Sequence, residues 1–468
     1  MIPIRRFWLG LVSLLVGSLL VFAAAAAAAA DDGDLDPLFG PSLSGIAHVG
    51  FDLGGTLADY AIATAVANDG AIVLAGSAVT GALPDSLNSA VTRLFPDGNV
   101  DPGFGSFGRL TFDTDFAGSQ DQLSAVGFLS TGEIVAAGTT GGNGASVVKL
   151  SANGIVEDQR VFHFAGQSGF LALAVAPGDK ILLAGYINRG TNYAFLVMRL
   201  LPDLGRDSSF AGTGETEIDF DLGAPVYDDD VATAVTLDHA GRVVVCGYAN
   251  FAAQDDDMAV ARLLANGQLD IGFSGDGRAT SFYDLGPNEK SDQCHGVAVD
   301  KGNAVYLAGT VKRDASPFQF AAVTRLFSTG NPDTNFGNFG LGRDVLSAVA
   351  SDIDAGGAIA VQSDGILAIG QGEGLTGKLG AARLTPAGFL DGSFGGGTGA
   401  VSYNVFFNGA ADRGAALALQ GGRIVLAGSG DVNGGGDRDF AAIRLQAALI
   451  FADDFELGDS SAWTTQAP

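Results

Sequence analysis

Basic residues, histidine and cysteine are scarce in this chain of 468 residues. It has 25 Lys and Arg against 52 Asp and Glu, so its net charge at pH 7 is −27. A surface this acidic repels the phosphate backbone, and we therefore expect no nucleic-acid partner. The four histidines, His48, His163, His239 and His295, are far apart in the sequence. This scarcity argues against a histidine-based metal or catalytic site.

Several catalytic and binding motifs are also missing. The chain has no G-x-S-x-G nucleophile elbow, no EF-hand loop and no nonapeptide calcium repeat. A G-x-G-x-x-G sequence at 372–377 is not followed by a helical pattern, so it lacks the helix N-terminus that a phosphate site needs. No segment between the repeats described below reads as an amphipathic helix. The sequence therefore predicts an all-β chain and identifies no catalytic residue.

The N-terminus has the pattern of a secretory signal peptide. Arg5 and Arg6 precede an apolar stretch at 7–22, and an alanine run at 23–30 supplies an A-x-A cleavage site. We expect export by the secretory route to an extracellular, periplasmic or cell-surface location, with no membrane span after cleavage. The alternative is an uncleaved anchor, because residues 7–30 are long enough to cross a bilayer.

Only two cysteines are present, Cys246 and Cys294. They fall in neighbouring repeats, and an exported protein folds in an oxidising compartment where disulfides persist. A disulfide between them is one interpretation. The other is two buried thiols that pack as small apolar residues.

What the chain has in abundance is glycine, 70 residues, and seven glycines end similar apolar runs. Ala71–Gly76 is the first run, and the spacing between the glycines is mostly about 60 residues. Each repeat contains short Val-, Ile- and Ala-rich segments separated by Asn-Gly or Asp-Gly turns, which is typical of an antiparallel four-stranded meander. The glycines are Gly76, Gly138, Gly185, Gly247, Gly309, Gly370 and Gly428.

Two series of charged residues run in phase with these glycines. A basic residue stands before a Leu in each repeat, an acid follows eight residues later, and a Phe usually follows the acid by three. We interpret each pair as a structural brace and each Phe as a plug between repeats. The pairs are Arg93 and Asp101, Lys149 and Glu157, Arg199 and Asp207, Arg262 and Asp270, Arg325 and Asp333, and Arg383 and Asp391.

Arg444 has no acid eight residues after it, and Asp36 has no base before it. If the array closes into a ring, Asp36 can pair with Arg444. The sequence therefore predicts a seven-bladed β-propeller built from seven four-stranded repeats of about 60 residues, which leaves no long exposed edges. An open β-solenoid is the alternative fold.

The repeat resembles the delta-60 repeat family of exported bacterial proteins. The matching segments are 35–40, 100–105, 181–185 and 440–445, and the resemblance covers roughly residues 35–447. The third repeat departs from the pattern because it lacks the Asp-x-x-Phe-Gly opening. The resemblance implies a propeller-like fold, and it implies no agreed activity and no catalytic residues.

These observations give an expected domain organisation. A signal peptide at 1–30 precedes the repeat domain at 31–447, and a C-terminal tail occupies 448–468. The tail is interpreted as a sorting or docking element, a last strand or a plain terminus. The expected repeats are about 35–99, 100–155, 156–205, 206–268, 269–331, 332–389 and 390–447.

A third series consists of aspartates 16 or 17 residues before the repeat glycine. In a ring these side chains would recur on one rim. Ca²⁺ takes six to eight oxygen ligands, which convergent loops can supply. Calcium is therefore one candidate cofactor, and the other interpretation is that each Asp caps its own turn. The residues are Asp59, Asp121, Asp230, Asp292 and Asp412.

The sequence favours a binding or scaffold module at the cell envelope or outside the cell, with an unknown protein or polysaccharide as its ligand. Loops such as Ala78–Asn88 and Val311–Pro317 would form the contact rim. Two alternatives remain open. One is a propeller-type enzyme, such as a lactonase-like hydrolase or a polysaccharide lyase, with a polar cluster at the central channel. The other is a purely structural envelope component.

Overall fold

The structure of the chain is a computed structural model. The expected signal peptide at 1–30, the tail at 448–468 and Asp412 lie outside the residues that it describes. The fold described below is that of the unit that begins at residue 31. The described residues are 32–53, 57–81, 86–114, 120–141, 144–222, 229–252, 255–283, 285, 291–312, 319–338, 342–346, 357–362, 367–370, 378–405, 413–431 and 436–446.

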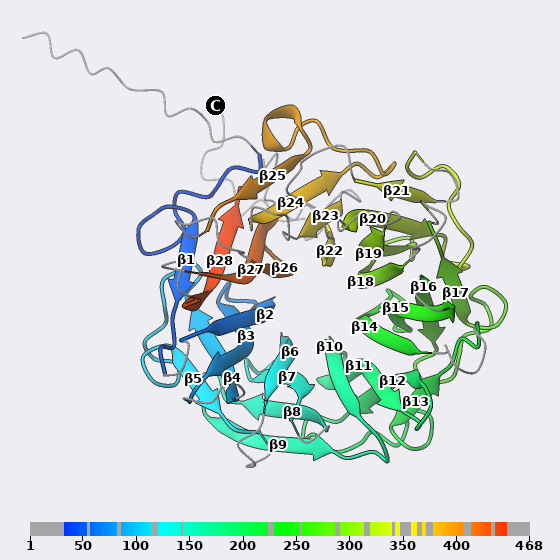
Figure 1. The fold of residues 1–468 in the computed structure, drawn as a ribbon, viewed down its shortest axis with the longest axis horizontal. Helices are drawn as coiled ribbons and strands as arrows, with labels where there is room; N and C mark the ends of the chain where they lie inside the picture. Colours follow the sequence, from blue (N-terminus) through cyan, green and yellow to red (C-terminus); the bar gives the residue numbers. More distant parts are fainter. Residues whose placement is uncertain are drawn as a thin grey trace, which may run out of the picture. The chain divides into compact units, whose positions relative to one another are not determined.

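Within these ranges the strands form seven four-stranded antiparallel sheets, which are arranged around a central axis as the blades of a β-propeller (Figure 1). Blade 1 contains β2 (Asp59–Val66), β3 (Ile72–Val79), β4 (Leu87–Leu94) and β5 (Arg109–Phe112). Blade 2 contains β6 (Gln122–Phe128), β7 (Ile134–Thr139), β8 (Ala145–Leu150) and β9 (Val156–Phe162). Blade 3 contains β10 (Ser168–Ala176), β11 (Lys180–Asn188), β12 (Tyr193–Leu200) and β13 (Glu215–Ile218).

The other blades repeat this arrangement, with the first strand of each innermost. Blade 4 contains β14 (Asp230–Leu237), β15 (Val243–Ala252), β16 (Asp255–Leu263) and β17 (Arg278–Ser281). Blade 5 contains β18 (Asp292–Val299), β19 (Val305–Lys312), β20 (Gln319–Leu326) and β21 (Arg343–Val345). Blade 6 contains β22 (Ala358–Val361), β23 (Leu367–Gly370), β24 (Leu379–Leu384) and β25 (Ala400–Tyr403), with a short 3₁₀ helix at Gly395–Gly397.

The closing blade combines the two ends of the propeller. Its inner strands are β26 (Arg413–Gln420), β27 (Arg423–Asp431) and β28 (Arg438–Leu445), and its outer strand is β1 (Ile46–Val49). β1 pairs with β28 in an antiparallel register that includes Ile46 opposite Ile443 and Val49 opposite Phe440. The ring is therefore closed by four residues from the beginning of the repeat domain, and the array is not an open solenoid.

The expected fold class needs a correction, because a repeat is not a blade. The expected repeat at about 206–268 includes the residues of β13 (Glu215–Ile218). In the structure β13 instead pairs with β12 of the preceding repeat, with Phe195 opposite Ile218. The reason is local: the Asp-x-x-Phe loop turns the chain back along the strand that it has just left. Each blade therefore takes its outer strand from the following repeat.

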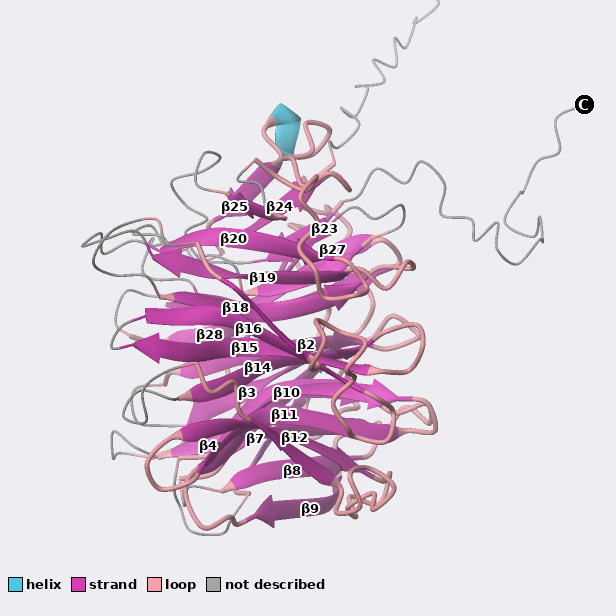
Figure 2. Cartoon of the chain, turned by 90° about the vertical axis from the view of Figure 1, so that its right-hand side faces the viewer, coloured by secondary structure: helices cyan, strands magenta, loops and turns pink. Residues whose placement is uncertain are grey.

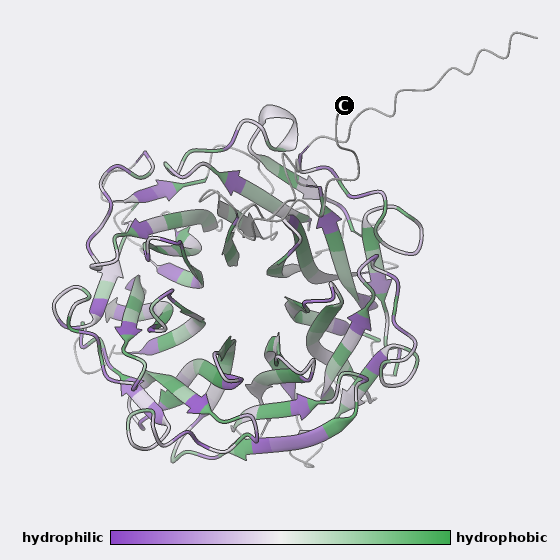
Figure 3. Ribbon diagram, turned by 180° about the vertical axis from the view of Figure 1, so that it is seen from behind, coloured by the Kyte–Doolittle hydropathy of each residue, from purple (hydrophilic) through white to green (hydrophobic). Residues whose placement is uncertain are grey.

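The middle strands of each blade account for the apolar runs. All eight residues of β3 are buried, because both faces of this sheet pack against neighbouring blades. A strand covered on both faces reads as a continuous apolar run rather than an alternating one. In Figure 3 the hydrophobic residues predominate along the strands nearest the axis, and hydrophilic residues occur in loops, at strand ends and on outer strands.

The repeated glycine has a single physical cause. The inner strand of most blades shifts register at one residue, such as Ile62 in β2, which lies between Ala61 and Ala63. This bulge brings a carbonyl of the inner strand onto the second strand, where a Cβ at Gly76 would lie 1.8 Å from the Tyr60 oxygen. The same arrangement recurs at Gly138, Gly185, Gly247 and Gly309, where the distance is 1.9 Å. Only glycine fits these positions.

Candidate functional site

The blades have two rims with different chemistry, seen at opposite ends of the strands in Figure 2. We call the end at which the first strand of each blade begins the entry rim. The opposite end, at which the third strand finishes and the Asp-x-x-Phe loop begins, is the clamp rim. The predicted braces lie on the clamp rim, and the four predicted calcium ligands that the structure describes lie on the entry rim.

The basic and acidic series meet as expected from their spacing. Asp36, from before β1, accepts a hydrogen bond from Arg444 of β28 across the ring closure. In five pairs the Arg Nε faces an Asp oxygen, and the distance between them is 2.8 Å in four of these pairs. The pairs are Arg199 and Asp207, Arg262 and Asp270, Arg383 and Asp391, and Arg444 and Asp36 at 2.8 Å, and Arg93 and Asp101 at 3.6 Å. Arg325 pairs with Asp333 through its terminal nitrogen.

Four of these arginines also donate to a carbonyl of the next blade: Arg93, Arg199, Arg262 and Arg444. Arg199 donates a hydrogen bond from Nη1 to the Ala265 carbonyl, and its guanidinium lies 4.7 Å from the centre of the Phe210 ring. The amide that follows Phe210 donates to the Asn266 carbonyl at 2.6 Å. The ring of Phe210 packs on Gly267, where a Cβ would lie 3.0 Å from it. We call this unit of Arg, Asp, Phe and the turn of the next blade the clamp.

The clamp recurs around the ring. Its Phe residues are buried, and the amide after each one donates to the exit turn of the following blade. In the third repeat, which lacks the Phe, Lys149 lies 3.0 Å from Glu133 and 3.5 Å from Glu157. Because the clamp uses the guanidinium for contacts within the protein, these arginines are occupied in holding neighbouring blades together. The buried clamp phenylalanines are Phe39, Phe104, Phe210, Phe273, Phe336 and Phe394.

The clamp also lowers the pKa values of three of its aspartates. Burial raises the pKa of the Asp207 carboxyl, but hydrogen bonds from Lys180 and Ser209 and the charge of Arg199 outweigh it. The pKa of Asp207 therefore lies well below its usual value. The same balance lowers the pKa of Asp270 and Asp391. These acids stay ionised at neutral pH and complete the ion pairs.

Four of the predicted calcium ligands are fully buried and sit in four different blades. Each uses Oδ2 to accept a backbone N–H from the segment that leaves the preceding blade. This is the geometry of a cap on the connection between two blades. The bonds run from Phe51 to Asp59 at 2.6 Å, Thr114 to Asp121 at 2.6 Å, Phe220 to Asp230 at 2.7 Å and Tyr283 to Asp292 at 2.5 Å.

The two cysteines form a disulfide between Cys246 of β15 and Cys294 of β18, so it joins blades 4 and 5. Thr233 Oγ1 donates to the Cys294 carbonyl at 2.6 Å beside it. The next residue, His295, is the bulged residue of β18, and its Nε2 lies 3.2 Å from Thr310 Oγ1. Burial lowers the pKa of His295 to about 4, so the imidazole is neutral at physiological pH.

The four histidines lie in different elements. His48 is in β1, His163 follows β9, His239 is in the turn after β14 and His295 is in β18. Among the residues that the structure describes, the one group of three carboxylate or imidazole side chains close enough for a shared metal is Asp52, Asp437 and Asp439. None of the four predicted calcium ligands within the described ranges belongs to that group.

A group of tyrosines and polar side chains breaks the symmetry of the entry rim in blades 3, 4 and 5. The Tyr186 and Tyr193 rings meet edge to face with centres 5.5 Å apart, and Tyr193 Oη donates to Gln167 Oε1 at 2.8 Å. The Tyr193 amide donates to Asp229 at 2.9 Å. Burial, followed by the charges of Asp256 and Asp229, raises the pKa of Tyr248 to about 12.

Asp256 connects this group to blade 5. Its Oδ2 accepts from Gln293 Nε2 at 2.7 Å and from Ser291 Oγ at 2.8 Å, and its Oδ1 accepts from Asn250 Nδ2 at 2.8 Å. A continuous set of aromatic, amide and carboxylate groups thus crosses three blades. We call it the tyrosine patch; it consists of Gln167, Tyr186, Tyr193, Asp229, Tyr248, Asn250, Asp256, Ser291 and Gln293.

Sequence reasoning missed this patch, although the sequence held a signal for it. The residue after the repeat glycine is Ser77, Thr139, Tyr186, Tyr248, Thr310, Gln371 or Ser429. Two neighbouring repeats therefore carry a tyrosine, whereas four others carry a small hydroxyl residue and one carries a glutamine. The residue type at this position varies between repeats, although its place in the strand is the same in each. Such variation is typical of a binding position in a repeat array, whereas a packing position keeps the same residue type.

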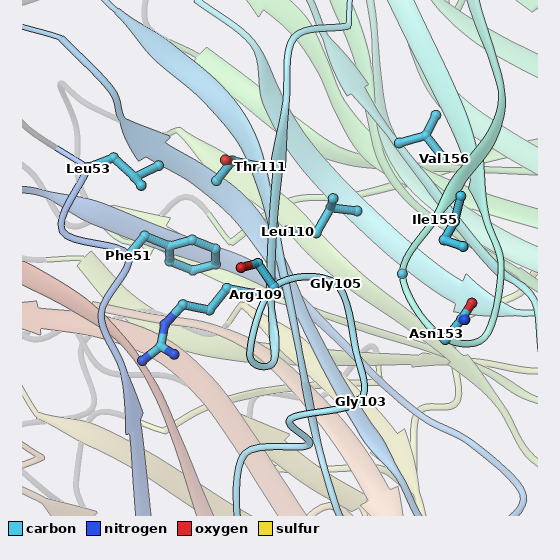
Figure 4. Close-up of a pocket in the computed structure, with 12 residues that line it drawn as sticks. Phe51, Leu53, Gly103, Gly105, Arg109, Leu110, Thr111, Asn153, Ile155 and Val156 are labelled. Atoms are coloured by element: carbon cyan, nitrogen blue, oxygen red, sulfur yellow. The ribbon is translucent and has the colours of Figure 1, made fainter.

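A hollow of about 660 Å³ lies on the outer wall between blades 1 and 2 (Figure 4). Phe51 and Leu53 line one side, Leu110 lies near its centre, and Ile155 and Val156 line the other side. Arg109, at its edge, donates from Nε to the Gly50 carbonyl at 2.6 Å, so it too is used between blades. A second hollow lies at the matching place between blades 3 and 4. These hollows therefore follow from the repeat geometry.

Comparison with known proteins agrees with the fold. The model of the family described as "Domain of unknown function (DUF5122) beta-propeller" matches residues 67–104, 178–210 and 241–273. These segments include middle strands and clamp loops of blades 1, 3 and 4. The match supports a β-propeller, whereas the resemblance to the delta-60 repeat family stays a prediction. No curated protein matches the chain.

Several solved structures are similar in fold at low identity. The BP39L lectin from Burkholderia pseudomallei has a TM-score of 0.47 at 12% identity, over 83% of this chain and 98% of that chain. The polysaccharide lyase Uly1 has a TM-score of 0.45 at 11% identity, over 83% and 90%. The Pan2 WD40 domain of Neurospora crassa has a TM-score of 0.43 at 10% identity, over 88% and 96%. At these identities they indicate nothing about the ligand.

Within the described part of the chain, no helix has the length and apolar character needed to cross a bilayer.

Proposed function

We propose that this protein is exported and acts as a binding module at the cell envelope or outside the cell, with a polysaccharide as its ligand on the tyrosine patch. The observation that supports the proposal is that the two rims carry different kinds of residue. The clamp rim uses its repeated charged and aromatic residues for contacts between blades. On the entry rim, blades 3 and 4 carry a tyrosine directly after the repeat glycine, where the other repeats carry Ser, Thr or Gln.

The chemistry of the patch fits a sugar surface. Tyrosine rings present apolar faces that pack on the C–H groups of a pyranose, and their hydroxyls stay available for hydrogen bonds. A carboxylate such as Asp256 can accept hydrogen bonds from sugar hydroxyls, and an amide such as Asn250 can both donate to them and accept from them. A net charge of −27 disfavours polyanions, so the proposed ligand is a neutral or amino-sugar polysaccharide.

The test is a binding titration of the purified protein against soluble neutral glucans, chitosan fragments and a polyuronate. We expect a neutral or amino-sugar polymer to bind and the polyuronate to fail. Tyr186→Ala with Tyr248→Ala should weaken binding at least about tenfold, a loss of about 1.4 kcal/mol. The matched control is Ser77→Ala with Thr139→Ala, at the same strand position in blades 1 and 2, which should leave the affinity unchanged.

Three results would count against the proposal. Binding of no polysaccharide, together with capture of an envelope protein that the tyrosine variant loses, would identify a protein ligand at the same patch. Equal loss in the tyrosine variant and in the control would place the ligand elsewhere. Turnover of a bound polysaccharide would make the protein an enzyme.

A further inference from the structure

Asp256 gives blade 4 a carboxylate at a strand position that is not acidic in the other blades whose described register includes it. Asp256 is paired with Asn250, the third residue after the repeat glycine. The residue paired at the same position is Leu87 in blade 1, Tyr193 in blade 3, Gln319 in blade 5 and Arg438 in the closing blade. The carboxylate is therefore a feature of this blade and does not follow from the repeat.

A second carboxylate of the tyrosine patch departs from the repeat in the same way. Asp229 stands directly before the entry-rim aspartate of blade 4. Asp229 Oδ1 accepts the Tyr193 amide, and its backbone carbonyl accepts the Asn250 amide at 3.1 Å. It therefore joins the tyrosine corner of blade 3 to the strand that carries Tyr248. The residues directly before the entry-rim aspartates of blades 1, 2 and 5 are Ala58, Gln120 and Ser291.

These two carboxylates have neutral hydrogen-bond partners and no basic one. The donors to Asp256 are two side-chain amides and one hydroxyl, and the donor to Asp229 is a backbone amide. Among the described residues, neither Asp229 nor Asp256 forms an ion pair with a basic side chain. Arg189, which follows β11, pairs instead with Glu217 and Asp219. Two negative charges are thus held beside the tyrosine rings without a countercharge from the described chain.

The tyrosines next to these charges are arranged to receive a ligand. The Tyr186 and Tyr193 rings stand nearly perpendicular, with an angle of 83° between their planes. The hydroxyls of Tyr186 and Tyr248 bond to no described residue, and neither oxygen is buried. Ring faces and carboxylates both present negative potential, so together they favour an organic cation over a neutral group.

We propose that the tyrosine patch binds the protonated amine of an amino-sugar polymer, with the ammonium group beside Asp256 and Asp229 and against the tyrosine rings. This inference rests on the proposed polysaccharide ligand and narrows it to a cationic class. A protonated amine offers three N–H donors, which the carboxylates and the free tyrosine hydroxyls can accept. A neutral sugar could stack on the rings, but it would leave both carboxylates without a countercharge.

The first test compares two ligands that differ only at nitrogen. A glucosamine oligomer and its fully N-acetylated form of the same length are titrated calorimetrically into the purified protein, in a buffer in which the free amine is protonated. We expect the amine form to bind at least about tenfold more tightly. Asp256→Asn keeps the shape of the side chain and removes its charge, so it should abolish this preference and leave binding of the N-acetylated form within about twofold.

The matched control is Asp257→Asn, the next residue on β16. It removes the same charge from the same strand, but successive side chains of a strand point to opposite faces of the sheet. The preference for the amine form should survive in this variant. Equal loss in the two variants would show that overall charge, rather than contact at the patch, selects the ligand, and would overturn the inference.

The second test examines the ring faces. Tyr186→Leu keeps an apolar side chain and removes the aromatic face, whereas Tyr186→Phe keeps that face and removes only the hydroxyl. Affinity for the amine form should fall about two- to fivefold further in Tyr186→Leu than in Tyr186→Phe. Equal affinities of the two variants would contradict a contact between the ammonium group and the ring.

The outcomes separate this inference from the proposed function on which it rests. If both oligomers bind equally, and Tyr186→Ala with Tyr248→Ala weakens both, the cationic class is wrong and the polysaccharide ligand stands. If neither oligomer nor any other polysaccharide binds, both are wrong. Binding of a lysine-rich peptide that Asp256→Asn abolishes, without binding of the glucosamine oligomer, would move the cation from a sugar to a protein and also overturn the inference.

Discussion

At the scale of single residues, the protein depends on buried charges that pair with one another across its blades. Arg262 is 2% exposed, pairs with Asp270 at 2.8 Å, lies 4.7 Å from the Phe273 ring and donates to the Ser328 carbonyl of the next blade. One side chain thus joins a strand, a loop and a neighbouring blade. Loss of one member leaves its partners buried and unsatisfied, which costs more than the pair contributes.

Replacement of this arginine tests the clamp. Arg262→Met should lower the free energy of unfolding by about 3–5 kcal/mol, because Asp270 would keep its charge with less compensation. Arg206→Met is the control, since the Arg206 and Glu215 pair is 40% and 23% exposed. Exposed pairs contribute about 0–1 kcal/mol. Urea unfolding measures the loss of unfolding free energy in both variants. Equal losses would show that the buried clamp pair stabilises the protein no more than the exposed pair.

His295 gives the protein a dependence on acid. Its pKa is lowered by burial to about 4, from 6.5 for a free imidazole. The unfolded chain therefore binds more protons than the folded one between these values, so stability falls as the pH falls from about 6.5 to 4. The loss reaches about 3 kcal/mol. Urea unfolding at pH 7 and pH 4.5 measures this effect. Between these two pH values the unfolding free energy of the parent protein should fall more than that of His295→Gln. An equal fall in the two proteins would contradict the assignment.

At the scale of elements, the turns are shaped for the contacts between blades. Gly267 has a φ of +86°, and a Cβ there would lie 2.8 Å from the Ala211 amide nitrogen. Gly241 has a φ of +74°, with nothing within 4 Å of the same position. The two glycines share a backbone conformation and differ only in whether another blade approaches them.

This pair separates backbone strain from packing between blades. Gly241→Ala should cost about 1–2 kcal/mol, for the positive φ alone. Gly267→Ala should cost about 1–3 kcal/mol more, because the methyl group would displace the Phe210 loop from the turn. Thermal unfolding of the two variants gives the comparison. If the two variants are equally destabilised, the contact of the Gly267 turn with the Phe210 loop does not contribute to stability.

The disulfide is a further contact between blades. It joins Cys246 and Cys294 across 48 residues and two blades. In the chain-entropy model a loop of this length is worth about 4 kcal/mol. Cys246→Ala with Cys294→Ala should lower the unfolding free energy by about that amount in denaturant titration. A variant as stable as the parent would show that the Thr233 contact and the packing of blades 4 and 5 suffice.

At the scale of the whole molecule, the sequence predicted what repeats and missed what varies. The spacing of Arg444 and Asp36 predicted closure, because every other base has an acid eight residues later. The offset between repeat and blade was not predictable from periodicity, because a shift by one strand leaves the period unchanged. The tyrosine patch was missed because its members come from three blades, and only the closed ring brings them together.

The most direct test of the account is a hydrogen-exchange map of the protein with and without the best-binding polysaccharide of the panel. The account predicts slower exchange at residues 186–193 and 248–256 on the entry rim, and unchanged exchange in the clamp loops at 207–214 and 270–277. Protection confined to the clamp rim, or to the entry rim of blades 1 and 2, would contradict the assignment of the tyrosine patch as the binding surface.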